Sequence, residues 1–357
     1  MTIPSDLFQS FVDKKKSLQG NKIWPITTFS LSRNLSVMKF LPCLSKEKKL
    51  ELLQLITSYF NDSMSLDEFF ILSLKDSLLW QKELLLEHFV FPYDLIGNPG
   101  GEALIVNRTG DILIAINFQD HLILHIIDFD SEPEKALDKL IQLDNYLHNK
   151  LSFAFSSEFG FLTTNPKHCG TALKGHCFLH TPALVYSKGL ANILNEDAEI
   201  VSSALLPSTT DLSGNVIVLS NRCSLGLTEE QIISSLRIWA SKISVAESSA
   251  KKCYSEESSG ELKNHILRSL GLLTHSYHLE LKETLDALSW LQLGIELGWI
   301  RNPKNHSIGN LLFWQVRRAH LALQQPEESR DLKKETITQL RANLLKMLAA
   351  DLIPEGF

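Results

Sequence analysis

The clearest structural signal in the sequence is Ala103-Leu104-Ile105-Val106-Asn107-Arg108-Thr109-Gly110-Asp111-Ile112-Leu113-Ile114-Ala115-Ile116. Two short apolar runs, rich in β-branched residues, flank a polar turn that contains a glycine. This pattern predicts two strands joined by a short turn. A third strand is expected over His121–Asp128, and a helix over about 133–151.

Helical spacing of apolar residues predicts helices at 5–18 and at 45–60, the second capped by Ser45. The Thr228-Glu229-Glu230-Gln231 capping box opens another helix, which is expected to end near Ala246. The Ser-, Lys- and Glu-rich segment Ala246–Gly260 is predicted to be a linker, and only helical periodicity follows it. Further strands are expected at 159–164, 177–184, 200–206 and 215–219. The fold class is therefore α+β: a largely antiparallel sheet flanked by helices, then a helical C-terminal domain.

Composition limits the classes of protein that this chain can belong to. The 357 residues are 44% hydrophobic and 21% charged, which is typical of a packed globular protein. A formal net charge of −6 argues against a general nucleic-acid surface, which needs excess Lys and Arg. The sequence lacks a signal-peptide pattern at its N-terminus and an apolar run of about 20 residues, so no membrane segment is expected. Five cysteines without a CxxC pair suit free thiols in the cytoplasm.

Specific strings narrow the class further. Phe161-Leu162-Thr163-Thr164-Asn165-Pro166 leads into Gly170-Thr171-Ala172-Leu173-Lys174 and then into His180-Thr181-Pro182-Ala183-Leu184. This series resembles the signature of the ATP:guanidino phosphotransferases (phosphagen kinases), in which LTSCP precedes GTGLRASV and HLPAL. Asn117-Phe118-Gln119-Asp120-His121-Leu122 is similar to the family's NEEDHIR string, and Leu31-Ser32-Arg33-Asn34 is similar to the end of SSRIRLARN.

The helical tail narrows the resemblance to one branch of the family. Arg268-Ser269-Leu270-Gly271, Lys282-Glu283-Thr284 and Leu293-Gly294-Ile295-Glu296-Leu297-Gly298 resemble the bacterial protein-arginine kinases. Glu328-Ser329-Arg330-Asp331-Leu332-Lys333-Lys334 is similar to their ERDIRR region, which implies phosphoarginine binding at Arg330 and Asp331. We therefore expect a phosphagen-kinase-like catalytic domain over 21–250 and a helical C-terminal domain over 251–357. The helical spacing near the start of the chain adds an N-terminal helix over 1–20.

Transfer of a phosphoryl group to a guanidinium needs cations around the phosphates, Mg²⁺, and a carboxylate that orients and deprotonates the acceptor nitrogen. Compared with the family pattern, this chain has replaced nearly all the phosphate-binding arginines. The replacements are Thr28, Ser30, Ile123, Lys174 and Ser203. The family's paired glutamates become Phe118 and Gln119, so the expected base is an amide, which cannot take up a proton.

The resemblance implies roles for the family positions that remain. Gln119, at the glutamate position and predicted to be inert, and Asp120 belong to the catalytic site. His88 and Lys174 belong to the nucleotide site, with Mg·ATP as the cofactor if any nucleotide binds. A second cluster, formed by His168, Cys169, His176, Cys177 and His180, fits zinc-ligand spacing only loosely, so no metal site is predicted.

These replacements favour a catalytically impaired pseudokinase that acts through protein binding or regulation. The alternative is an active kinase that transfers the γ-phosphate of ATP to arginine residues of proteins. The resemblance implies a homodimer and a protein partner in quality control, either an adaptor or an unfoldase. Neither nucleic acid nor a membrane is expected as a partner.

Overall fold

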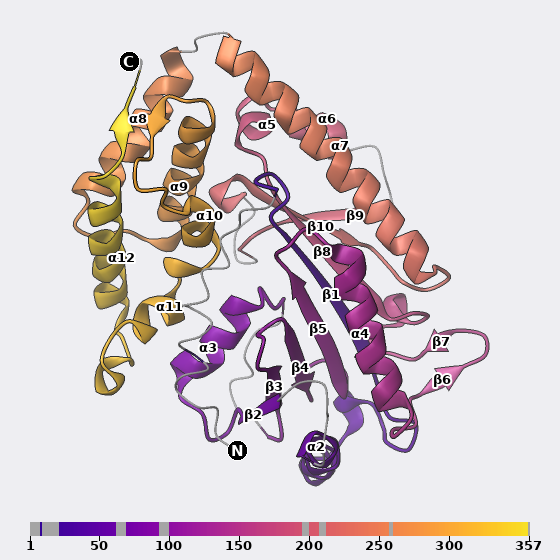
Figure 1. The fold of residues 1–357 in the computed structure, drawn as a ribbon. Coiled ribbons are helices and arrows are strands. Elements are labelled where there is room, and N and C mark those ends of the chain that lie inside the picture. Colours follow the sequence, from indigo (N-terminus) through magenta and orange to yellow (C-terminus); the bar gives the residue numbers. More distant parts are fainter. Residues whose placement is uncertain are drawn as a thin grey trace. The chain divides into compact units, whose positions relative to one another are not determined.

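A computed structural model of the protein describes residues 8, 21–61, 69–92, 100–194, 200–206, 212–256 and 260–355. The chain forms two compact units, each built from separate stretches of sequence (Figure 1). Unit 1 comprises Met1–Lys14, Ile26–His176 and Ser220–Leu236, and unit 2 comprises Lys15–Pro25, Cys177–Leu219 and Arg237–Phe357. These units are defined by contacts in space, so the predicted sequence boundaries at residues 20 and 250 stay a prediction.

An eight-stranded sheet is the main β-structure, and the predicted antiparallel pairing is confirmed where register is defined: β1 with β5, β2 with β3, β3 with β4 and β4 with β5. The unit boundary divides β8 after His176 and β10 after Leu219. The strand order is β2 (Phe69–Ser73), β3 (Ala103–Asn107), β4 (Ile112–Ile116), β5 (Leu122–Asp128), β1 (Ile26–Arg33), β8 (Leu173–His180), β10 (Val216–Asn221) and β9 (Ile200–Ala204).

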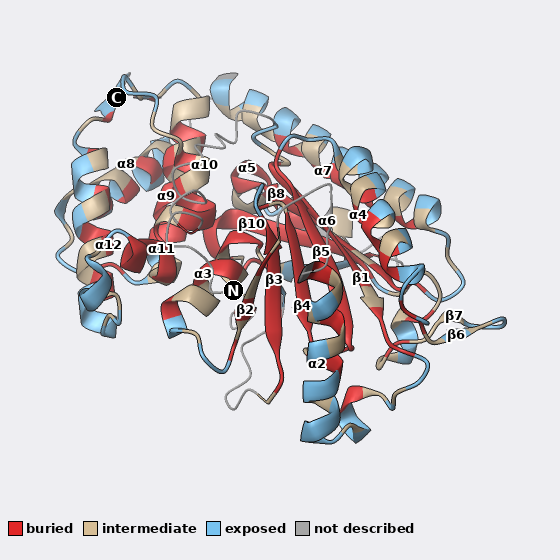
Figure 2. Cartoon of the chain, turned by 60° about the horizontal axis from the view of Figure 1, so that its bottom comes forward, coloured by how far each residue is buried: buried red, intermediate tan, exposed pale blue. Residues whose placement is uncertain are grey.

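The turn between β3 and β4 follows from its polar residues. The Oδ1 atom of Asn107 accepts hydrogen bonds from the backbone N–H groups of Asp111 and Ile112, at 3.2 and 2.9 Å. Gly110 has a φ of 69°, which glycine adopts without steric cost. Every residue of β3, β4 and β5 is buried (Figure 2). The stretch 103–116 therefore forms the centre of the core of unit 1.

The two faces of β1 have different environments. Helix α4 (Pro133–His148) packs on β1 and β5, and Asp144 of α4 pairs with Arg33 of β1. Because successive side chains of a strand point to opposite faces, Thr28 and Ser30 lie on the face that is turned away from α4. Ser30 is opposite His125 in the register of β1 and β5. This second face, called here the polar face, carries the candidate site.

The helical tail predicted from sequence is confirmed in unit 2. Helix α8 (Gly260–His275) packs on α9 (Leu281–Glu296) and on α12 (Lys334–Ala349). The shorter α10 (Ile308–Asn310) and α11 (Arg318–Leu323) lie between α9 and α12 in the chain. A pair of two-residue strands, β11 (Ile300–Arg301) and β12 (Ile353–Pro354), was not expected from the periodicity.

The predicted capping box is confirmed. The predicted linker at Ala246–Gly260 is wrong as far as residue 256, and residues 257–259 lie outside the described residues. Thr228 N–H donates to Gln231 Oε1 at 2.9 Å, and Gln231 N–H donates to Thr228 Oγ1 at 3.2 Å. Helix α7 (Glu229–Glu256) then continues ten residues beyond Ala246. The serines that suggested a linker donate their hydroxyl hydrogen bonds to backbone carbonyls four residues earlier, Ser248 to Ser244 and Ser249 to Val245. Because these bonds form within the helix, the serines do not favour a turn over the helix here.

The two predicted N-terminal helices have different outcomes. Helix α2 (Lys46–Asn61) is confirmed, and Ser45 Oγ accepts from Lys48 N–H at 3.4 Å. Of the helix predicted over 5–18, only Phe8 is described; it is helical and buried, with its ring 5.3 Å from that of Trp80. Helix α3 (Leu79–His88), which the periodicity did not indicate, also belongs to unit 1.

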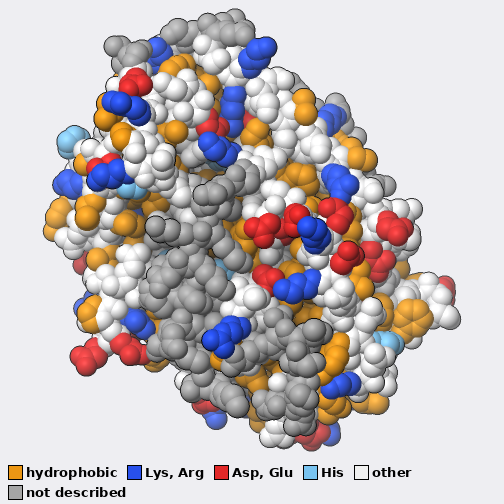
Figure 3. All heavy atoms as spheres, in the orientation of Figure 1, with side chains coloured by type: hydrophobic (Ala, Val, Ile, Leu, Met, Phe, Trp, Pro, Cys, Tyr) orange, Lys and Arg blue, Asp and Glu red, His pale blue; other side chains and the backbone are white. Residues whose placement is uncertain are grey.

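The surface carries mixed charge. On the face drawn in Figure 3, acidic and basic side chains of the described residues are interspersed. All five cysteines are free thiols, of which Cys43 and Cys253 are exposed. Within the described ranges, no helix has the length and apolar character that a membrane span requires.

Candidate active site

The turn between β4 and β5 carries Gln119 and Asp120, the residues predicted at the acceptor site. Asp120 is 3% exposed. Its Oδ1 atom accepts hydrogen bonds from Asn34 Nδ2 and from the backbone N–H of Thr164, both at 2.7 Å. Asp120 therefore joins this turn to the end of β1 and to the loop at 163–169. One of its two oxygens already has two donors.

Gln119 is half-buried, and its side chain makes no hydrogen bond to the described residues. An amide can donate and accept hydrogen bonds, but it does not accept a proton near neutral pH. This position therefore offers orientation without basicity. The assignment of Gln119 and Asp120 to an acceptor site stays a prediction.

His121, another family position, has both ring nitrogens engaged. Its Nδ1 atom accepts from the backbone N–H of Leu35 at 3.0 Å, and its Nε2 atom lies 2.9 Å from the carbonyl oxygen of Lys39. Because a carbonyl oxygen only accepts, Nε2 must be the donor, which defines a neutral ring. Burial lowers the pKa of His121, so the ring stays neutral at physiological pH. His121 holds the chain after β1 in place.

Two of the replaced arginine positions lie on the polar face and bond to histidines. Ser30 Oγ is 2.8 Å from His125 Nδ1, and Thr28 Oγ1 is 3.4 Å from His176 Nδ1. Burial lowers the pKa of His125 to about 4 and that of His176 to about 3. Both imidazoles are therefore neutral at pH 7, and these pairs bring no positive charge to the polar face.

The three other replaced arginine positions differ from one another in burial, location and charge. Ile123 of β5 is fully buried, with none of its surface exposed. Ser203 lies on β9 in unit 2 and is exposed. Lys174 of β8 is the one replacement that keeps a charge.

Lys174 is half-buried, and its Nζ donates a hydrogen bond to the carbonyl oxygen of Asn221. Burial lowers the pKa of Lys174 to about 8, and the nearby Cys223 opposes this shift. An ammonium has three donors, so two remain for a ligand. Lys174 can therefore bond a phosphate oxygen, although without the two-pronged geometry of an arginine.

We expect nucleotide binding to weaken as pH rises through 8. Lys174 is a cation below its pKa of about 8 and a neutral amine above it, so a charge-assisted hydrogen bond to phosphate is lost on that side. We expect this to cost about 1 kcal/mol of binding free energy, which corresponds to a roughly fivefold rise in Kd for Mg·ADP between pH 7 and pH 9.5. Isothermal calorimetry at both pH values checks this. Lys174→Met should bind more weakly at pH 7 and show no such decline; an equal decline in Lys174→Met would contradict the assignment.

His88, predicted at the nucleotide site, is 6% exposed at the end of α3. Its Nε2 atom lies 2.9 Å from the carbonyl oxygen of Gly110, and its ring packs edge-on against Phe89 at 4.9 Å. This environment supports the position of the β3–β4 turn. A nucleotide-binding role for His88 stays a prediction.

Arg330 and Asp331, predicted to bind phosphoarginine, lie in unit 2. Arg330 is half-buried, and its Nε donates to the carbonyl oxygen of Gln325 at 3.2 Å. The side chain of Asp331 is 96% exposed and lies 3.9 Å from Arg318. The two residues are thus directed to different environments, and their role stays a prediction.

The sequence did not reveal the part played by two residues of unit 1. Arg33, quoted only for its likeness to a family string, forms a two-pronged pair with Asp144 and is 2% exposed. His125 went unnoticed, although its position two residues after Ile123 places both on the same face of β5. That alternation was the available signal.

The cysteines and histidines between residues 168 and 180 are divided between the two units. His168 and His176 belong to unit 1, and His180 belongs to unit 2, where its Nε2 lies 2.8 Å from Ser289 Oγ. Throughout the part of the chain that is described, no three His, Cys, Asp or Glu side chains are grouped so that they could hold a metal ion.

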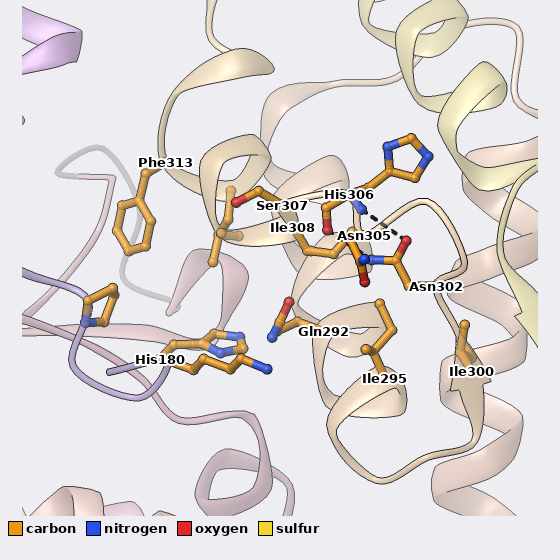
Figure 4. A pocket seen from close by; sticks show the side chains of 14 residues that line it. His180, Gln292, Ile295, Ile300, Asn302, Asn305, His306, Ser307, Ile308 and Phe313 are labelled. Atoms are coloured by element: carbon orange, nitrogen blue, oxygen red, sulfur yellow. Dashed lines mark hydrogen bonds between the residues drawn. The ribbon is translucent and has the colours of Figure 1, made fainter. Parts of the chain in front are cut away.

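Unit 2 contains a pocket of about 560 Å³ (Figure 4). Its walls combine apolar side chains with amides and imidazoles, and none of the predicted site residues lines it. In Figure 4, Gln292 lies between His180 and Ile295, and the ring of His306 turns away from the other labelled side chains. Gln292 Nε2 donates to Glu296 at 2.6 Å, and His306 Nε2 lies 3.0 Å from Asp351.

Comparison with protein families gives two matches in sequence order. Residues 51–250 match the ATP:guanido phosphotransferase C-terminal catalytic domain, and residues 259–353 match the protein-arginine kinase McsB C-terminal domain. The chain is 67% identical over 358 residues to a protein of Chlamydia pneumoniae named protein-arginine kinase, and the match covers 100% of both chains. A protein of Chlamydia muridarum with the same name is 49% identical, with 98% of this chain and 99% of that protein covered.

Solved structures show the same fold. The duplicated taurocyamine kinase of Schistosoma mansoni with bound transition-state analogue components aligns with a TM-score of 0.56 and 23% identity over 63% of this chain. That duplicated chain is longer, and the match spans 33% of it. Lombricine kinase aligns with a TM-score of 0.56 and 15% identity, covering 70% of this chain and 71% of the other. The expected α+β fold is therefore confirmed.

Proposed function

Because this chain belongs to the protein-arginine kinase family of ATP:guanido phosphotransferases, we propose that it transfers the γ-phosphate of ATP to arginine side chains of proteins. One observation carries the proposal: the catalytic-domain match at 51–250 is followed at 259–353 by the domain named for protein-arginine kinases. An arginine within a protein is therefore a better candidate acceptor than free arginine or creatine.

The polar face offers a nucleotide one positively charged side chain among the replaced arginine positions. Lys174 can bond a phosphate, whereas the hydroxyls of Thr28 and Ser30 already bond to neutral histidines. Mg²⁺, when bound to the phosphates, neutralises charge that develops during transfer. The described residues bring no set of three ligands together for it. Low affinity for nucleotide follows from this arrangement.

We expect Mg·ATP to bind with a Kd of about 1 mM or weaker, which corresponds to only about 4 kcal/mol of binding free energy. The physical reason is that one cation replaces a set of planar guanidinium groups. Calorimetric or thermal-shift titration with Mg·ATP and Mg·ADP measures it. A micromolar Kd that disappears in Lys174→Ala would contradict this prediction and would mean that the phosphate site is complete.

Phosphoarginine formation tests the proposed function directly. The full chain is incubated with Mg·ATP labelled at the γ-phosphate and an arginine-rich protein, and acid-labile phosphoarginine is quantified against an active member of the family. Turnover above the level without enzyme supports the proposal. Its absence at millimolar ATP, with the protein folded, would overturn it.

The second candidate is a catalytically impaired protein that acts through protein contacts. Two observations favour it: the amide at Gln119, and the engagement of Thr28 and Ser30 by uncharged His176 and His125. This was the reading that the sequence alone favoured, while the names of the relatives support transfer. The phosphoarginine assay distinguishes an active kinase from a catalytically impaired protein.

We expect Gln119→Glu to raise turnover less than tenfold. A general base contributes about 10²–10⁴-fold only when the phosphates and the acceptor are already positioned. The side chain at position 119 makes no hydrogen bond to the described residues, so none of them would hold the new carboxylate toward the acceptor. The rates of the wild type and the variant are compared on the arginine-rich protein and on free arginine. A gain of a hundredfold would show that the carboxylate at position 119 is held in a productive orientation and that the reaction needs it as its base.

Partners and compartment follow from the same proposal. A protein substrate is implied by transfer to protein arginines, and we further propose a homodimer that works with an adaptor or unfoldase of protein quality control. Free thiols at all five cysteines suit the reducing cytoplasm, where we place the protein.

A further inference from the structure

His168 is held at the end of a rigid turn beside the candidate acceptor site. It is the last residue of the 3₁₀ turn Pro166–His168, and its backbone N–H donates to the carbonyl oxygen of Asn165 at 2.9 Å. Asn165 Oδ1 accepts from Lys167 N–H at 3.2 Å, and Ser224 N–H donates to the Lys167 carbonyl at 3.1 Å. These bonds fix the backbone from which the imidazole projects.

The same turn is joined to the segment that carries Gln119. Thr164 N–H donates to Asp120 Oδ1 at 2.7 Å, and Thr163 Oγ1 donates to the carbonyl oxygen of Asn165 at 2.8 Å. Because Gln119 directly precedes Asp120, the turn with His168 and the former glutamate position belong to one hydrogen-bonded substructure. The turn that carries the imidazole is thus anchored to the segment in which the family pattern requires a base.

The Nδ1 atom of His168 is buried and has no hydrogen-bond partner among the described residues, and the same is true of Thr164 Oγ1. His121 and His125 of unit 1, in contrast, have partners at both ring nitrogens. A buried polar atom without a partner lowers stability because it has lost its hydrogen bonds to water, so it calls for an explanation such as a ligand. The lone pair or proton of His168 Nδ1 is therefore not used by any described residue, and the residue as a whole is half-buried.

The surroundings keep this imidazole uncharged. Burial lowers the pKa of His168 below its usual 6.5, the positive charges of Lys174 on β8 and of Lys167 on its own turn act in the same direction, and Asp120 opposes them. At pH 7 the ring is therefore neutral. With its proton on Nε2, Nδ1 is a hydrogen-bond and proton acceptor.

We propose that His168 Nδ1 is the proton acceptor of the transfer reaction, in the place of the carboxylate that Gln119 lacks. This inference rests on the proposed kinase function. The acceptor guanidinium nitrogen forms a bond to the γ-phosphorus while the bond from that phosphorus to the β,γ-bridging oxygen breaks. The nitrogen's proton passes to His168 Nδ1, which becomes an imidazolium, and ADP leaves with the bridging oxygen. The imidazolium then loses the proton to water.

The test compares wild type, His168→Gln and His168→Gly from pH 5.5 to 9, with Mg·ATP and an arginine-rich protein. We expect His168→Gln to lower kcat about 100-fold, at the lower end of what a general base contributes. It should also remove the rise of kcat with pH through an apparent pKa below 6.5. Added imidazole should restore part of the activity of His168→Gly. The exposed His275 at the end of α8 provides the control, because His275→Gln should leave rate and profile unchanged.

Unchanged kcat and pH profile in His168→Gln, or no rescue of His168→Gly by imidazole, would overturn the proposal. A second measurement distinguishes failure of the role proposed for His168 from failure of the proposed kinase function. The His168 nitrogen resonance, identified by its loss in His168→Gln, is followed on adding an arginine peptide with Mg·ADP and nitrate. If wild type has no turnover, the kinase proposal and the proton-transfer step both fall. A shifted resonance would then retain His168 as an acceptor-site ligand, and an unmoved resonance would exclude it from the site.

Discussion

Replacing Arg33 by methionine is expected to lower the free energy of unfolding by about 3–5 kcal/mol, because it leaves the Asp144 carboxylate buried without its counter-charge. The guanidinium bonds this carboxylate at two points, 3.0 Å from Nε to Oδ1 and 2.8 Å from Nη2 to Oδ2. It also donates through Nη1 to the carbonyl oxygens of Ser32 and Thr171 and lies 3.7 Å from the centre of the Phe161 ring. Equilibrium urea denaturation followed by circular dichroism measures the loss.

Two controls make this result specific. Lys48→Met breaks a pair with Glu51 in which both side chains are more than half exposed, and it should cost no more than about 1 kcal/mol. The double variant Arg33→Met/Asp144→Leu should be more stable than Arg33→Met alone, since it removes the uncompensated charge together with its partner. A single variant as stable as Lys48→Met would mean that solvent reaches Asp144.

The sheet could be predicted because its signals are local. The run at 103–116 forms β3 and β4 as expected, and the bonds of Asn107 explain why the polar residues between them turn. The strand predicted over 177–184 was wrong at its end: β8 stops at His180, and Pro182 begins the short helix α5 (Pro182–Tyr186). Proline suits the first turn of a helix and cannot donate within a sheet, which was the signal that the apolar run concealed.

The candidate site could be predicted only as a set of positions. Matching strings identified Asp120 and His121, yet their bonding partners Asn34 and Leu35 are about 86 residues away in the chain, and no local pattern reports such a bond. The replacement of arginines by Thr28 and Ser30 was visible in the sequence. That these hydroxyls meet neutral histidines depends on the pairing of β1 with its neighbours, which tertiary structure alone defines.

If the chain transfers phosphate, Lys174→Met is expected to lower turnover by about 10³-fold or more, the range seen when a single cation is lost from a phosphoryl-transfer centre. Methionine keeps most of the stem volume and removes the charge, so the fold should persist. Among the five replaced arginine positions, Lys174 alone carries a positive charge, so no second cation at those positions can compensate.

Lys174→Arg is the matched control, because it keeps the charge and supplies the planar fork that bonds two phosphate oxygens at once. We expect it to retain turnover within about tenfold of the wild type, since the loss of the hydrogen bond to the Asn221 carbonyl and the gain of a second phosphate contact act in opposite directions. Rates are measured at saturating arginine-rich protein and at several millimolar ATP, so that a change in kcat is separated from a change in KM. Melting temperatures of all three proteins establish that each is folded. Equal kcat in Lys174→Met and in the wild type would show that Lys174 does not contact the transferred phosphate, and the cation that does would then have to come from residues outside the polar face.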